Sequence, residues 1–242
     1  MKAHVTQLVR ASLCAAGLLL APSAGQAAIL LPGTTTTLTA ADILATPAGT
    51  LLASVVQPLV TLDYTGTLTA AVLRNAGGTL DFYYQVSNDA TSIDPLARET
   101  NTTFKSIAPP QIFTTEARYR TDDAGLPLLF VAGDVNATPL SADRTSNARV
   151  VGFGFLSPVV LEGIDPGETS MILVVRTNAV AFTGGISSVI DGTTSTVRTF
   201  SPLATPISTV PEPASLLLLS SAFGAAGYLA RHRARRKKPG SA

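Results

Sequence analysis

Apolar and polar residues alternate over residues 78–89 of the chain. Every second position from Leu80 to Val86 is leucine, phenylalanine, tyrosine or valine, the period of a strand with one buried face. The intervening positions belong to Thr79, Asp81, Tyr83 and Gln85, and we expect this second face to lie in water. Tyr83 would then be a single exposed aromatic ring, which is more often an ordinary strand residue than a surface on which a sugar stacks.

Residues 67–74 alternate in the same way, with Leu68, Ala70 and Val72 on one face. The turn-forming sequence Asn-Ala-Gly-Gly at 75–78 separates the two alternating stretches. Two such runs joined by a short glycine-containing turn predict a β-hairpin.

Further strands are predicted downstream. Residues 149–156 place Val151, Phe153 and Phe155 on one face and two glycines on the other. Glycines on one face of a strand indicate that a neighbouring sheet or loop approaches closely.

Within residues 170–177, the run from Met171 to Val175 is apolar on both faces, which predicts a central strand, and the turn sequence Asp-Pro-Gly-Glu at 165–168 precedes it. Weaker strand patterns cover residues 128–132 and 194–200. Residues 39–45 alone indicate a helix, because Thr39 and Asp42 have the spacing of a capping box.

Short strands with frequent turns and little helix predict an all-β fold. We expect a single β-sandwich, immunoglobulin-like or jelly-roll-like, over residues 29–200. Apolar residues make up 46% of the chain, enough to build its core. Between residues 29 and 208, nine Lys or Arg oppose fifteen Asp or Glu, a net charge of −6. Such a segment has no basic stripe, so a nucleic-acid partner is not expected.

Cysteine and histidine are absent from the predicted sandwich. The only three such residues, His4, Cys14 and His232, lie in the end segments. This excludes serine–histidine and cysteine–histidine catalysis, His or Cys metal sites and disulfides from the sandwich. The sequence therefore predicts a protein that is not an enzyme and needs no cofactor.

Acidic residues are the remaining candidates for chemistry. Most lie beside Gly, Pro or Thr in predicted turns, so we expect solvated loop acids rather than a glycosidase pair. Asp134, Asn136 and Thr138 resemble the start of a calcium loop, but Pro139 and Thr145 stand where glycine and glutamate are required. No metal site is predicted.

The N-terminal residues 1–28 have the organisation of a signal peptide. Lys2 and Arg10 precede an apolar run at 11–21, and small residues follow, which favours cleavage after Ala27 or Ala28. The run is shorter than the roughly 20 residues that span a bilayer, so an N-terminal anchor is disfavoured. Export from the cytoplasm is therefore expected.

The C-terminal part divides into three segments. Prolines punctuate residues 201–213, which predicts an extended spacer. Residues 214–230 carry no charge and are long enough for one transmembrane helix. Residues 231–242 form a basic tail that the positive-inside rule places in the cytoplasm. Its basic residues are Arg231, Arg233, Arg235, Arg236, Lys237 and Lys238.

The order of these segments resembles the PEP-CTERM sorting signal. Val-Pro-Glu-Pro-Ala at 210–214 is followed by the apolar run and then by the arginine-rich end, and the resemblance covers residues 211–238. It implies processing by exosortase, with Pro211, Glu212 and Pro213 as the recognised motif. It also implies a Gram-negative host, a transient stay in the inner membrane, and a surface role tied to exopolysaccharide and biofilm. The stretches 78–89 and 151–155 resemble the ectodomains of other PEP-CTERM proteins.

Two functions fit these patterns. The first is an exported, non-enzymatic protein of the cell surface or extracellular matrix, associated with exopolysaccharide. The alternative is a carbohydrate- or ligand-binding β-sandwich that stays anchored by its uncut helix.

Overall fold

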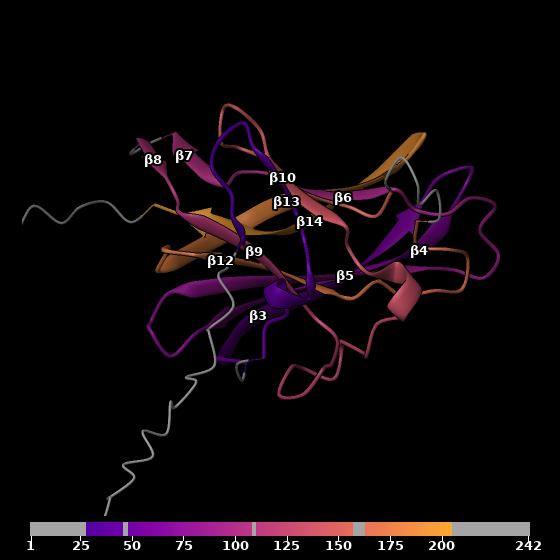
Figure 1. Ribbon diagram of the computed structural model, residues 1–242, viewed down its shortest axis with the longest axis horizontal. Helices are drawn as coiled ribbons and strands as arrows, with labels where there is room; N and C mark the ends of the chain where they lie inside the picture. Colours follow the sequence, from indigo (N-terminus) through magenta and orange to yellow (C-terminus); the bar gives the residue numbers. More distant parts are fainter. Residues whose placement is uncertain (1–27, 46–47, 108–109, 157–162, 205–242) are drawn as a thin grey trace, which may run out of the picture. The chain divides into compact units, whose positions relative to one another are not determined.

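The computed structural model describes residues 28–45, 48–107, 110–156 and 163–204 (Figure 1). Within these residues two six-stranded antiparallel sheets face each other as a sandwich, and helical structure is limited to two short 3₁₀ turns, η1 (Ala40–Asp42) and η2 (Val135–Ala137). The predicted all-β sandwich is confirmed.

Sheet A contains the predicted hairpin and the predicted central strand. Its order is β1 (Ala28–Ile29), β9 (Thr115–Arg120), β12 (Ile172–Thr177), β5 (Leu80–Asn88), β4 (Thr65–Arg74) and β3 (Thr50–Val60). Strands β4 and β5 pair from Gly66 with Asn88 to Arg74 with Leu80, which confirms the hairpin. Strand β12 lies between β9 and β5, as its two apolar faces predict.

Sheet B is built mostly from shorter strands. Its order is β14 (Thr193–Leu203), β13 (Ala181–Asp191), β6 (Arg98–Asn101), β11 (Val151–Gly154), β10 (Ser141–Arg144) and β2 (Thr35–Thr37). A separate pair, β7 (Lys105–Ile107) and β8 (Pro110–Ile112), follows β6 along the chain. The glycines of β11 do allow a close approach, but by side chains of the paired strands and not by another sheet or loop: the Arg98 guanidinium of β6 lies over Gly152 and reaches Asp143 on β10 at 2.9 Å.

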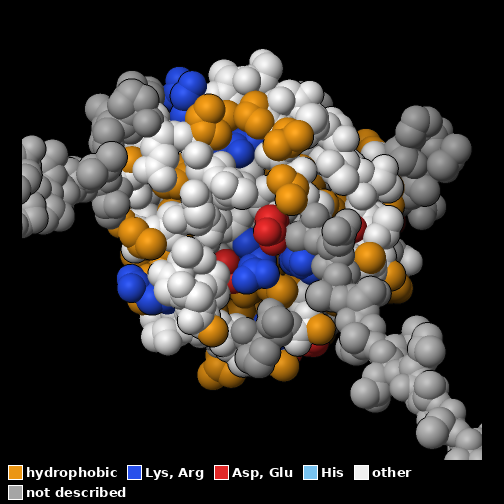
Figure 2. All heavy atoms as spheres, turned by 60° about the vertical axis from the view of Figure 1, so that its left-hand side comes forward, with side chains coloured by type: hydrophobic (Ala, Val, Ile, Leu, Met, Phe, Trp, Pro, Cys, Tyr) orange, Lys and Arg blue, Asp and Glu red, His pale blue; other side chains and the backbone are white. Residues whose placement is uncertain are grey.

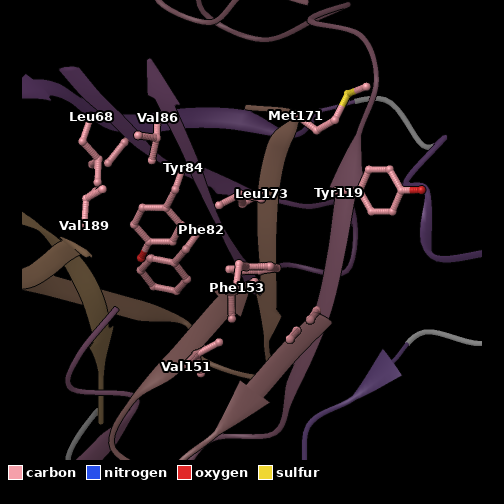
Figure 3. Close-up of a cluster of buried hydrophobic side chains, with 14 of the residues drawn as sticks. Leu68, Phe82, Tyr84, Val86, Tyr119, Val151, Phe153, Met171, Leu173 and Val189 are labelled. Carbon is pink, nitrogen blue, oxygen red and sulfur yellow. The ribbon is translucent and has the colours of Figure 1, made fainter. Parts of the chain in front are cut away.

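The main core lies between the sheets (Figure 3). Sheet A contributes the alternating residues Leu68, Phe82, Tyr84 and Val86, and sheet B contributes Val151, Phe153 and Val189. Phe82 packs edge to face on Phe104 with 5.6 Å between the ring centroids. The period-two pattern of the sequence therefore predicted the buried face of the hairpin correctly.

The opposite face of β5 is not in water, so that expectation is wrong. Tyr83 and Gln85 are at most 4% exposed, because residues 121–134 cross the outside of sheet A as a strap. Asp81 is buried beside Asn75 and Arg176. Phe130 of the strap packs edge to face on Tyr83. The Gln85 amide donates to the Val131 carbonyl at 2.8 Å and accepts from the Val131 N–H at 3.1 Å.

The strap also overturns two smaller expectations. Residues 128–132 form no strand, because Val131 bonds to the Gln85 side chain in place of a neighbouring strand. The Tyr83 ring is buried, so it offers no surface for a sugar.

Other local predictions have mixed outcomes. The turn at 165–168 is confirmed, with Gly167 at φ 91° and a bond from the Glu168 N–H to the Asp165 carbonyl. The capping box of Thr39 and Asp42 forms, but it caps only the single turn η1 because the backbone is extended again at Ile43.

Strand β14 extends to Leu203, past the predicted start of the spacer at Ser201. Pro202 lies in it because β14 is an edge strand, where a missing N–H costs no ladder bond. Two long strands escaped prediction, β3 with Pro58 inside it and β13 with Gly184 and Gly185 inside it. Gly185 is required there, since a Cβ would lie 2.6 Å from the Phe200 backbone carbon.

One buried side chain, Arg144 at the end of β10, joins segments that are distant in the sequence. Its guanidinium donates to the carbonyls of Phe113 at 2.8 Å and Phe104 at 2.9 Å, and to the Thr115 hydroxyl at 2.7 Å. Longer bonds reach the carbonyls of Ala148 and Leu30. Burial lowers the pKa of Arg144. Arg144 of sheet B thus binds an oxygen of sheet A and four carbonyl oxygens of the connecting segments at this end.

We predict that Arg144→Lys destabilises the fold. Lysine has three donors on a point charge and cannot satisfy acceptors spread around a planar guanidinium. Buried acceptors left unpaired cost about 1–3 kcal/mol each, so we expect a loss of about 2–3 kcal/mol. Urea unfolding of the processed protein measures it. Arg198→Lys, on the exposed surface of β14, is the matched control. Equal stabilities of the two variants would contradict this role for Arg144.

Candidate functional site

A polar hollow opens on the outside of sheet A, at the end where β4 turns into β5. It has two adjoining lobes of about 270 Å³ and about 700 Å³, which share Asn75, Thr79 and Arg176. The smaller lobe is completed by Thr114, Glu116, Thr177 and Asn178. Figure 2 looks onto this end of the molecule, where acidic and basic side chains gather near the middle among neutral ones.

A row of charges crosses three strands at the floor of the hollow. The strand register places Glu116 of β9 beside Arg176 of β12, and Arg176 beside Asp81 of β5. Arg176 Nε lies 3.4 Å from Asp81 Oδ2, and Arg176 Nη1 lies 4.0 Å from Glu116 Oε2. The guanidinium is therefore held between two carboxylates.

Asn75 fixes the inner carboxylate. Its Nδ2 donates to Asp81 Oδ1 at 2.8 Å and to the Thr79 hydroxyl at 2.9 Å, while its Oδ1 accepts the N–H groups of Gly77 and Thr79. Burial raises the pKa of Asp81, and the Asn75 hydrogen bond and the Arg176 charge oppose that rise. Gly78, at φ 82°, closes the turn that positions Asn75.

A second polar cluster lies inside the sandwich. Asn101 Nδ2 donates to Glu99 Oε2 at 2.9 Å, the Ser187 hydroxyl donates to Asn101 Oδ1, and Ser187 and Thr199 share a bond of 2.7 Å. Glu99 and Ser187 are fully buried. Burial raises the pKa of Glu99 to about 8, opposed by the Asn101 hydrogen bond and the Arg98 charge. No substrate reaches such a serine in the folded state, so the cluster has a structural role.

The expectation of solvated loop acids is therefore wrong for three carboxylates. Glu99, Asp81 and Asp42 are each at most 5% exposed. Each is bonded by a polar group that makes burial tolerable, and for Asp42 this is the Thr39 N–H at 2.8 Å.

Asp134 takes part in a loop contact, since its Oδ2 accepts from the Thr169 N–H at 2.7 Å. Across residues 28–45, 48–107, 110–156 and 163–204 there is no group of three or more His, Cys, Asp or Glu arranged to hold a metal ion.

The predicted sorting residues lie outside the described part of the chain. This applies to Pro211, Glu212 and Pro213, to the basic cluster 231–238, and to Ala27. Among the described residues no helix is long and apolar enough to cross a membrane, and the predicted span 214–230 lies beyond them. Ala28 is described: it begins β1, is buried, and pairs with Ala117 of β9.

Comparison with known proteins identifies the C-terminal segment. Residues 209–236 match the PEP-CTERM protein-sorting motif, so the predicted signal is present and includes Pro211, Glu212 and Pro213. The motif implies an exported protein that exosortase processes and that is sorted to the cell envelope. No curated protein and no solved structure matches the chain.

The buried Glu99 makes the stability of the fold depend on pH. The direction of this dependence follows from the raised pKa of its carboxyl group. The unfolded carboxyl has a pKa of 4.5 and the folded one about 8, so between these values only the unfolded state releases the proton. Stability then falls as pH rises from about 4.5 to about 8, by up to about 1.4 kcal/mol per pH unit.

Glu99→Gln removes this dependence. We expect the variant and the wild type to have similar midpoints near pH 4.5, with the variant increasingly more stable toward pH 8. Thermal unfolding across this range measures the difference. Asp89→Asn, an exposed carboxylate, is the control and should follow the wild type. Parallel curves for Glu99→Gln and wild type would refute the assignment.

Proposed function

We propose that this chain is a non-enzymatic protein of the bacterial cell surface or extracellular matrix that works in association with exopolysaccharide. The observation that carries the proposal is the PEP-CTERM match at residues 209–236. The signal peptide starts export, and exosortase acts on the Pro-Glu-Pro motif. The apolar segment 214–230 and the basic residues behind it hold that motif at the inner membrane until processing.

The packing of the sandwich supports a function that the protein performs after its C-terminal segment has been removed. Its core clusters join both sheets and draw on residues from Ala28 to Ala204 among those that the structure describes. The acids with the strongest burial are bonded inside the fold, as expected for structural groups.

The two candidate signal-peptide cuts differ in their effect on the fold. Cleavage after Ala27 keeps Ala28 in β1, where it is buried against β9, whereas cleavage after Ala28 would shorten a strand of two residues to one. This supports Ala28 as the first residue of the mature protein.

A second candidate function is ligand binding by a sandwich that keeps its anchor. The polar hollow at the β4–β5 turn favours it, because convergent polar groups in a concavity are typical of binding sites.

The mature mass tests the proposal. We expect the wild-type protein from its native cell to begin at Ala28 and to lack the basic residues through Lys238, whereas Glu212→Ala keeps them and stays in the inner membrane. Ser208→Ala, just outside the matched motif, is the control and should be processed normally. A wild-type protein that retains its basic tail would contradict processing and favour the anchored alternative.

A further inference from the structure

The smaller lobe of the hollow has the organisation of a binding site for hydroxyl groups. We propose that it binds a neutral, hydroxyl-rich ligand, a single sugar unit of a glycan, through Glu116, Arg176 and Asn178. The inference rests on the proposed function, because it assigns the surface through which the sandwich would contact exopolysaccharide.

The donor at the centre of the lobe is held in place before any ligand arrives. Arg176 lies between Asp81 at 3.4 Å and Glu116 at 4.0 Å in two ion pairs, its Nε makes no hydrogen bond to a described residue, and Asp81 is held by the Asn75 hydrogen bond. Binding therefore orders little, and a preformed guanidinium loses less side-chain entropy than a free one. Its side chain is 32% exposed, so it remains accessible from the lobe.

Donors and acceptors alternate around the lobe. Glu116 is one-third exposed, and its nearest cations, Arg118 and Arg176, are both 4.0 Å away, so its oxygens retain room to accept a shorter hydrogen bond. Asn178 uses Oδ1 to accept the Thr114 N–H at 3.0 Å, which leaves its NH₂ group for a ligand. A hydroxyl donates once and accepts twice, so it fits a site with a carboxylate on one side and N–H donors on the other.

The charge balance selects against ionic ligands. The residues lining the smaller lobe include one acid, Glu116, and one base, Arg176, and the remainder are Asn and Thr. An anion would meet the Glu116 carboxylate, and a cation would meet Arg176, so neither gains a net attraction. The lining has no aromatic or large aliphatic side chain, which disfavours an apolar ligand.

The smaller lobe by itself has room for about one sugar unit. About 270 Å³ lies below the range of roughly 300–1,000 Å³ that is usual for drug-sized ligands. With no aromatic ring to stack on, each contact is expected to be weak. A repeating polysaccharide presents many identical units, and several tethered sandwiches can then bind it together by avidity.

Saturation-transfer-difference NMR on the protein purified from its native envelope tests this site. It detects weak ligands directly, and the probes are neutral, uronic-acid and amino-sugar oligosaccharides. We expect transfer to neutral oligosaccharides only. Glu116→Gln should weaken it about tenfold, the effect of one charge-assisted hydrogen bond. Asp89→Asn removes the same charge at the opposite end of the sandwich and should leave transfer unchanged.

A thermal midpoint equal to that of the wild type checks that Glu116→Gln is folded. Asn178→Asp serves as a second variant, because it keeps the oxygen that accepts the Thr114 N–H and removes the NH₂ donor. Absence of transfer, transfer to uronic acids alone, or equal transfer in wild type and both variants would overturn the proposal. In each of these cases a correctly processed C-terminus would leave the proposed sorting intact. A failure of processing would instead remove the proposed function, whatever the hollow binds.

Discussion

The guanidinium of Arg144 holds together an end of the sandwich that the strands alone do not close. Strand β1 has only two residues, too few to be held by its own ladder, yet it begins the folded unit. Arg144 contacts the Leu30 carbonyl directly after β1 and the Phe113 and Thr115 oxygens that precede and begin β9. The segment that follows the predicted signal peptide is therefore bonded to both sheets through one side chain. The predicted cleavage site for export thus lies directly before a segment that the fold bonds in place.

The remaining polar groups of the sandwich fall into two kinds. Glu99, Asn101, Ser187 and Thr199 bond to one another inside the fold, where they join β13 to its two neighbours β6 and β14. Asp81, Arg176 and Glu116 lie in one row across sheet A, where Arg176 and Glu116 reach solvent and Asp81 is buried. The same residue types are thus bonded to one another inside the fold and partly exposed to solvent at its surface.

The sequence predicts what depends on neighbours in the chain. The hairpin β4–β5, the turn at 165–168 and the central strand β12 follow from local period and turn chemistry, and all are confirmed. The sorting motif is equally local, and residues 209–236 match it. Strands β3 and β13 escaped because Pro58 and the pair Gly184–Gly185 interrupt patterns that only their neighbours in the sheet stabilise.

The polar face of β5 shows most clearly what local sequence patterns cannot predict. Tyr83 and Gln85 read as solvent-facing, and they are covered by Phe130 and Val131 from a strap more than forty residues further along. The hollow was not predicted for the same reason, because Asn75, Glu116 and Arg176 come from three separate strands and turns. Burial and convergence of polar groups are properties of the tertiary fold, and no local period encodes them.

The central claim is that the sandwich reaches the envelope by a signal that is then removed. Cell fractionation with an antibody to the sandwich, in cells with and without exosortase, tests it most directly. The account predicts a shortened protein outside the inner membrane when exosortase is present, and a full-length protein retained in the inner membrane when it is absent. The same length and the same location in both cells would contradict it.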